Sequence, residues 1–114
     1  MSAGSYDILC EQGATFLRVL EVTDSVGDPI NYSGYTARMQ VRRRVDSDDV
    51  IIELTTENGR ISMNSSGQIV LSISATDTAD IQTGGVYDLE IINSSNEVER
   101  LIQGNFTLSL EVTR

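Results

Sequence analysis

The sequence of 114 residues contains no histidine, no lysine and no tryptophan, and it has a single cysteine and a single proline. Without histidine, neither a Ser-His-Asp triad nor a histidine-ligated metal site can form. One cysteine cannot make an internal disulfide bond, so we expect Cys10 to pack as a small apolar side chain. These absences remove most hydrolytic schemes, and composition and spacing show no other chemistry, so we expect no cofactor and no bound metal.

Basic residues are also scarce: 17 aspartates and glutamates stand against 8 arginines, and the formal net charge is -9. Such a chain repels nucleic-acid phosphates and anionic membrane surfaces, so the charge argues against both kinds of partner. No apolar run approaches the ~18 residues of a transmembrane helix. Residues 1–5 lack the basic and apolar parts of a secretory signal, and we expect synthesis in a cytoplasm.

Short runs of alternating apolar and polar residues recur about every ten residues, separated by Gly, Asn, Ser and Asp. This spacing predicts a single all-β domain over residues 1–114, an antiparallel β-sandwich, with a small closed barrel as the competing architecture. We expect three strands to turn these residues to the core: Ala37, Met39 and Val41; Ile69, Leu71 and Ile73; and Tyr87, Leu89 and Ile91.

Three stretches depart from simple alternation. Residues 15–23 are apolar on both parities, so we expect a strand that is covered on both faces or contains a bulge. Gly104 interrupts the last run, where we expect a bend or bulge. Residues 75–82 follow a potential cap at Ser74 and should form one short helical turn.

The run 84–92 is the best candidate for a central strand. It begins after a double glycine that includes Gly85, and we expect Leu89 to hold the core. In sandwich domains, a tyrosine near the start of such a strand can bury its ring and donate its hydroxyl to a nearby backbone group. Tyr87 is our candidate for this lock. Asp88 and Glu90 share the outer face and resemble a glycosidase pair in spacing, but we interpret them as solvated surface.

Half of the arginines lie close together. The cluster consists of Arg38, Arg42, Arg43 and Arg44. Arginine is favoured at protein interfaces, so these residues, with Tyr6, are our candidate interface; the alternative is a solvated strand face. Three aspartates follow at Asp46, Asp48 and Asp49, and we expect them to pair locally with the arginines in an ordinary loop.

An ordered set of motifs spans nearly the whole chain: Gly13-Ala14-Thr15-Phe16, Gly27-Asp28-Pro29-Ile30, Gly34-Tyr35-Thr36-Ala37-Arg38-Met39-Gln40-Val41-Arg42, Asn58-Gly59-Arg60-Ile61, Gly67-Gln68-Ile69, Ser74-Ala75-Thr76-Asp77, Gly85-Val86-Tyr87-Asp88-Leu89-Glu90 and Glu111-Val112-Thr113-Arg114. In order and spacing, the set resembles small tail-associated structural proteins of bacteriophages. It is similar to the N-terminal domain of upper baseplate proteins, immunoglobulin-like sandwiches that join fibre or receptor-binding proteins to the tail.

The resemblance implies an immunoglobulin-like fold and a non-enzymatic virion protein, an adaptor in the tail, neck or baseplate. Its expected partners are other virion proteins and copies of itself in a symmetric homo-oligomer. It would be made in the host bacterial cytoplasm and assembled into the virion, with the tail favoured over the capsid as its location. Residues 1–6 would form a flexible or partner-ordered arm. The alternatives are a capsid decoration (cement) protein and a carbohydrate-binding module.

Overall fold

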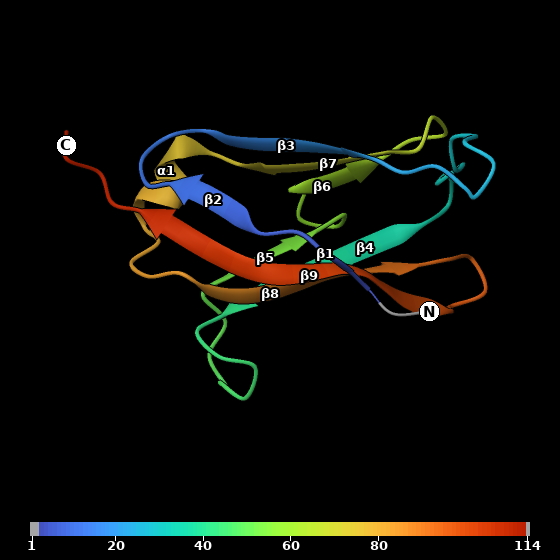
Figure 1. Cartoon of the computed structure of the whole chain (residues 1–114). Coiled ribbons are helices and arrows are strands. Elements are labelled where there is room, and N and C mark those ends of the chain that lie inside the picture. Colours follow the sequence, from blue (N-terminus) through green and yellow to red (C-terminus); the bar gives the residue numbers. More distant parts are fainter. Residues whose placement is uncertain (1–2, 114) are drawn as a thin grey trace.

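Figure 1 shows the computed structural model of the protein, which describes residues 3–113 and consists of two packed sheets. The larger sheet has the order β1-β9-β8-β4-β5, and β2 also pairs with β9. Its strands are β1 (Gly4–Ser5), β2 (Ile8–Glu11), β4 (Thr36–Arg42), β5 (Ile52–Thr55), β8 (Gly85–Ile92) and β9 (Val98–Ser109). The smaller sheet has the order β3-β7-β6, with strands β3 (Phe16–Glu21), β6 (Ile61–Met63) and β7 (Gln68–Ile73). The predicted all-β sandwich is confirmed.

The core lies between the sheets, and the alternation of β4, β7 and β8 builds most of it. Met39 is paired with Leu89 in the antiparallel β4–β8 ladder, and the two side chains are 1% and 0% exposed. All nine residues predicted to face inward are buried. The period of two therefore assigned the faces of these strands correctly.

The prediction for residues 15–23 was wrong. Phe16 is buried and Leu20 is partly buried, but Leu17 and Val19 are 55% and 51% exposed. The reason is topological: β3 is an edge strand of a three-stranded sheet, and its outer face carries no covering layer. Apolar residues on both parities reflected an exposed apolar face, which periodicity alone does not distinguish from a second buried face.

The bulge in the last strand lies at Leu101 and not at Gly104. Leu89 is paired with Ile102 and Glu90 with Arg100, which leaves Leu101 as the extra residue. Gly104 is needed for space: a Cβ there would overlap the Tyr6 carbonyl oxygen and lie 2.9 Å from its carbon. The glycine thus marks a close approach of the N-terminal segment and not a change of register.

The N-terminal segment lies along β9 in parallel. Ser5 is paired with Gln103, and Ile8 with Phe106, at one constant offset. Between these pairs, the Tyr6 N–H donates to the Gln103 carbonyl at 2.9 Å. Residues 4–6, which we expected in a flexible or partner-ordered arm, therefore pair with the same chain; Met1 and Ser2 lie outside the described residues.

Three chain reversals at one end of the molecule use the same five-residue turn (Figure 1, right). In each, the first side chain, Asp24, Asn64 or Asn93, accepts N–H groups two and four residues later at 2.9–3.1 Å. The fourth residue takes a positive φ, with Gly27 at 94°, Gly67 at 76° and Asn96 at 63°. The side-chain bonds replace backbone pairing that the turn cannot make, which explains the Asp/Asn-Ser-x-Gly/Asn pattern.

The predicted short helix is confirmed as α1 (Ala75–Ala79), with Ser74 as its N-cap accepting the Asp77 N–H. Its buried Thr78 hydroxyl donates to the Ala14 carbonyl at 2.8 Å and accepts the Gly13 N–H at 3.1 Å. The helix therefore fastens the β2–β3 connection and closes one end of the sandwich.

Asp77 also bonds Arg60, at 2.7 Å, and this hydrogen bond lowers the pKa of the Asp77 carboxyl. The folded state is thus favoured above the ordinary aspartate pKa of about 3.9, and this contribution is lost as the pH falls through the lower folded value. We expect Asp77→Asn to shrink the difference between the urea midpoints measured at about pH 7 and about pH 3. An unchanged difference would contradict this assignment.

Candidate functional site

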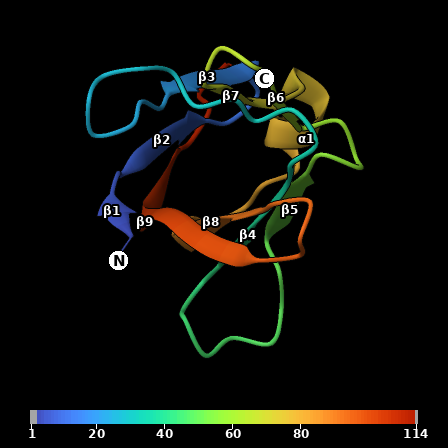
Figure 2. The same ribbon diagram turned by 90° about the vertical axis from the view of Figure 1, so that its right-hand side faces the viewer.

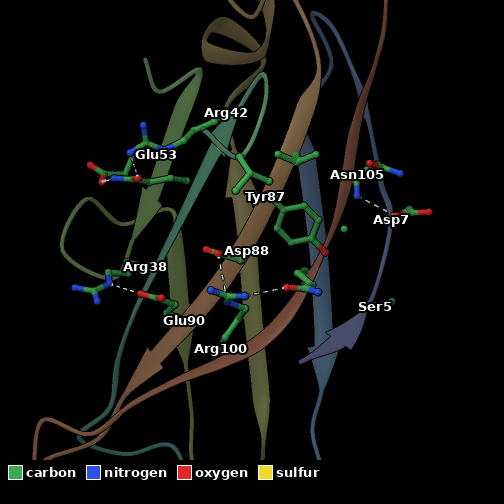
Figure 3. Close-up of a pocket in the computed structure, with 15 residues that line it drawn as sticks. Ser5, Asp7, Arg38, Arg42, Glu53, Tyr87, Asp88, Glu90, Arg100 and Asn105 are labelled. Atoms are coloured by element: carbon green, nitrogen blue, oxygen red, sulfur yellow. Dashed lines mark hydrogen bonds and ion pairs between the residues drawn. The ribbon is translucent and has the colours of Figure 1, made fainter. Parts of the chain in front are cut away.

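A groove of about 820 Å³ crosses the outer face of the larger sheet (Figure 3). Its floor consists of outward side chains of β4, β8 and β9, and its rim includes Glu53 of β5 and Val45 of the β4–β5 loop. Ser5 and Asp7 border it on the side of the N-terminal segment. The same alternation that turns Leu89 to the core turns Asp88 and Glu90 to the groove.

Two ion pairs cross the floor. Arg38 Nε lies 2.7 Å from Glu90 Oε1, and Arg100 Nε lies 3.4 Å from Asp88 Oδ2. The side chains of Arg38 and Arg100 are 55% and 54% exposed, so both guanidinium groups are oriented by a carboxylate and still face solvent. Asp88 and Glu90 are thus partners of arginines in an open groove, the arrangement of surface ion pairs and not of a desolvated catalytic pair.

Arg42 has a structural role. Its Nη1 donates to the carbonyl oxygens of Ser47 and Asp48 at 2.7 and 3.0 Å, and its Nη2 donates to Gln40 at 2.8 Å. Gln40 in turn donates to the Glu53 carboxylate at 2.8 Å. Arg42 therefore holds the β4–β5 loop against the sheet, and the expected pairing of Arg42 with loop carboxylates is replaced by bonds to loop carbonyls.

Residues 43–51 form a loop that extends away from the outer face of the larger sheet (Figure 2). Arg43 and Arg44 are exposed on this loop, and Arg44 Nε lies 3.7 Å from Asp46 Oδ1, with both side chains over 80% exposed. Val45, 88% exposed, contributes to the groove rim. The structure thus places the predicted arginines in and beside one groove.

The Tyr6 side chain, which we included in the candidate interface, is 39% exposed and does not line the groove. Conversely, sequence reasoning missed Arg100, which supplies one of the two ion pairs. Its signal was available: Arg100 is the one basic residue between Arg60 and Arg114.

Tyr87 lies beneath one end of this groove. Its ring is buried, and its hydroxyl donates to the Tyr6 carbonyl. Burial raises the pKa of Tyr87 well above its ordinary range. The hydroxyl reaches a main-chain acceptor, as expected of a corner lock, but the acceptor is 81 residues away in the chain. Tyr87 therefore fastens the N-terminal segment to the sheet and does not lock a neighbouring turn.

Among residues 3–113, no group of three or more Cys, Asp or Glu side chains is arranged to hold a metal ion. Within the same residues, no helix is long and apolar enough to span a bilayer. Cys10 is buried, and burial raises the pKa of its thiol.

No protein-family model and no curated protein sequence matches the chain. Solved structures do match: a chain in the crystal structure of ICOS in complex with ICOS-L and an anti ICOS-L VNAR domain superposes with a TM-score of 0.52 at 11% identity. The fold is an immunoglobulin-like β-sandwich. The match covers 96% of this chain and 56% of that one, so this protein spans little more than half of the matched chain.

A chain of the ZIG-8–RIG-5 IG1–IG1 heterodimer matches with a TM-score of 0.45 and 15% identity, over 95% of this chain and 83% of that one. The match to the ICOS complex has only 11% sequence identity. The likeness therefore concerns the fold alone, because one fold serves many functions.

Proposed function

We propose that the chain is a non-enzymatic structural protein of a bacteriophage virion. It would act as an adaptor in the tail, neck or baseplate, attaching fibre or receptor-binding components through symmetric protein–protein contacts. The ordered motifs that resemble tail-associated proteins support the location in a virion, and the groove supports a role in binding. Its partners would be other virion proteins and further copies of itself.

The distribution of arginine is the observation that carries the binding role. Five of the eight arginines lie in the groove or on the loop beside it, in a chain whose net charge is -9. They are Arg38, Arg42, Arg43, Arg44 and Arg100. Arginine forks pair with carboxylates of a partner, and side chains that are already oriented lose less conformational entropy on binding. The groove is therefore the surface on which we place the contact.

The location is tested by averaged electron-microscopy density of the virus that encodes the chain. We expect density for this sandwich in several symmetric copies at the tail, neck or baseplate. Regular occupancy of the capsid lattice would instead identify a decoration protein and overturn the adaptor role. Specific binding on a glycan array, with no density in the particle, would identify a carbohydrate-binding module.

The contact surface is tested separately, by neutralising both exposed floor arginines. We expect Arg38→Gln/Arg100→Gln to reduce the number of copies per particle about tenfold or more, because each lost interface ion pair costs on the order of 1 kcal/mol. Copies are counted by quantitative mass spectrometry of purified particles. The matched control Ser25→Glu/Ser62→Glu changes the charge equally at exposed positions outside the groove and should be incorporated normally. Equal incorporation of both variants would remove the groove from the contact.

A further inference from the structure

The outer edge of β3 has main-chain groups that are not paired with another strand of the described chain. The Val22 N–H donates to the Gly67 carbonyl at 2.8 Å. The backbone N–H and C=O groups of the even-numbered residues in this segment therefore point toward β7. Because backbone direction alternates along an antiparallel strand, the groups of Leu17, Val19 and Glu21 point to the open side. The Leu17 and Val19 side chains are half exposed on the outer face of the same strand.

This edge is self-complementary. When the strand pairs antiparallel with itself about an axis at residue 18, Leu17 of each copy lies opposite Val19 of the other, and the outward backbone groups meet. An axis at Val19 also matches the outward groups, but it sets Leu17 opposite Glu21. Since cross-strand apolar pairs stabilise a ladder, the register centred on residue 18 is the favoured one.

Arg18 occupies the centre of that register. Its Nη1 donates to the Leu17 carbonyl at 2.9 Å, and its Nη2 donates across to the Leu9 carbonyl of β2 at 2.8 Å. The guanidinium carbon is 4.7 Å from the centroid of the Phe16 ring. Arg18 thus takes up an acceptor that strand pairing would use, and it would bring two like charges face to face at the axis.

At the other side of the sandwich, a second arginine bridges the two sheets in the same way. Arg60 Nη1 donates to the Glu53 carbonyl of the edge strand β5 at 2.8 Å, while its Nη2 bonds Asp77. On both sides, an arginine from the smaller sheet or its flank caps a carbonyl of the larger sheet. The hydrogen bond from Arg18 to the larger sheet is therefore matched by a bond of the same kind from Arg60.

We propose that the unpaired edge of β3 is complementary to the same edge of a second copy of this chain, and that Arg18 prevents the two edges from pairing in the native protein. The inference does not depend on a virion location. It does imply that symmetric assembly of the native chain uses a face, such as the groove, and leaves this edge unpaired. Natural sandwiches commonly protect edge strands with charged side chains, and here the charge stands at the symmetry point of the competing pair.

The test is the self-association of Arg18→Met, which keeps an unbranched stem and removes the charge and the donors. We expect sedimentation equilibrium to show dimers with a dissociation constant at least about tenfold lower than that of the native chain. Arg18→Lys, which retains the charge, and Arg18→Met/Val19→Lys, which charges the apolar pair, should both behave like the native chain. A folded Arg18→Met with native association would overturn the proposal, as would association that survives Val19→Lys.

The register is tested by disulfide trapping. Arg18→Met/Leu17→Cys is mixed with Arg18→Met/Val19→Cys, and we expect the mixed dimer to form several-fold faster than either homodimer, because opposed strand positions lie within disulfide reach. Cys10 is buried and does not compete. Equal rates for all three dimers would exclude the register. If Arg18→Met folds poorly without its contact to Phe16, Arg18→Gln also removes the charge and should show the same tenfold gain; native association of that folded variant would overturn the proposal.

Discussion

Replacing Gly85 by alanine should lower the free energy of unfolding by about 3 kcal/mol or more, at the upper end of overpacking effects. A Cβ at this position would overlap the Arg42 carbonyl oxygen and lie 2.7 Å from its carbon and 2.9 Å from Arg43 Cα. All three atoms belong to the backbone, so no rotamer change relieves the overlap. Gly85 does not have a positive φ, and the requirement is therefore for space between β8 and the end of β4.

Urea unfolding followed by far-UV circular dichroism measures the effect. Gly4→Ala is the matched control, because its Cβ would meet only ordinary contacts at 3.7 and 3.8 Å and its φ is also not positive. We expect the control to change stability by less than about 0.5 kcal/mol. A Gly85→Ala domain as stable as the control would show that the end of β4 shifts at little cost, and that Gly85 is not a required close approach.

The central strands of the larger sheet, β4 and β8, were predictable because one face of each strand is buried and the other is solvated. In β4, Ala37 and Met39 alternate with Arg38 and Gln40, and this contrast leaves a single register that keeps charge out of the core. The three turns were predictable for a local reason, since each carries its own side-chain acceptor and its own positive-φ residue. Such elements need no information from distant residues.

The errors arose where tertiary position decides. Leu17 and Val19 have side chains fit for a core, but whether a second layer covers them depends on the order of strands. Leu101 is the bulged residue because β8 and β9 must stay paired on both sides of it, which no local pattern announces. Gly104 looked like a bulge and proved to be a contact with residue 6, 98 positions earlier in the chain.

The candidate groove was predicted in part. Alternation placed Arg38 and Arg42 on an outer face, but it did not separate their roles: Arg38 stays exposed beside Glu90, whereas Arg42 is engaged by the loop. The pairing of β9 with β8 brings Arg100 to Asp88, and this pair depends on the Leu101 bulge. Without the bulge, parity would have set Arg100 on the core side of β9. The groove therefore follows from strand order and register more than from the arginine cluster itself.

Tyr87→Phe should lower the free energy of unfolding by about 1 to 3 kcal/mol, because the Tyr6 carbonyl would lose its donor in a partly buried site. The hydroxyl acts across the segment where β9 carries Gly104, so its loss should loosen the pairing of residues 4–7 with β9. Faster amide hydrogen exchange at Tyr6 and Asn105, whose N–H groups bond the Gln103 carbonyl and the Asp7 carboxylate, measures this second effect.

The pH dependence of folding stability is an independent test of the role of Tyr87. Because burial raises the folded pKa of Tyr87, its contribution is complete below the ordinary tyrosine pKa of about 10 and is lost as the pH rises through the higher folded value. Tyr87→Phe should therefore flatten the alkaline loss of stability, with the remainder due in part to Tyr32, whose pKa burial also raises. Tyr35→Phe is the control for removing a tyrosine hydroxyl in the exchange measurement, since the Tyr35 ring packs edge-to-face on Tyr32 at 5.1 Å and its hydroxyl is not the one that bonds Tyr6. An unchanged urea midpoint and unchanged exchange at Tyr6 in Tyr87→Phe would show that packing of β1 and β2, and not the hydroxyl, holds the N-terminal segment.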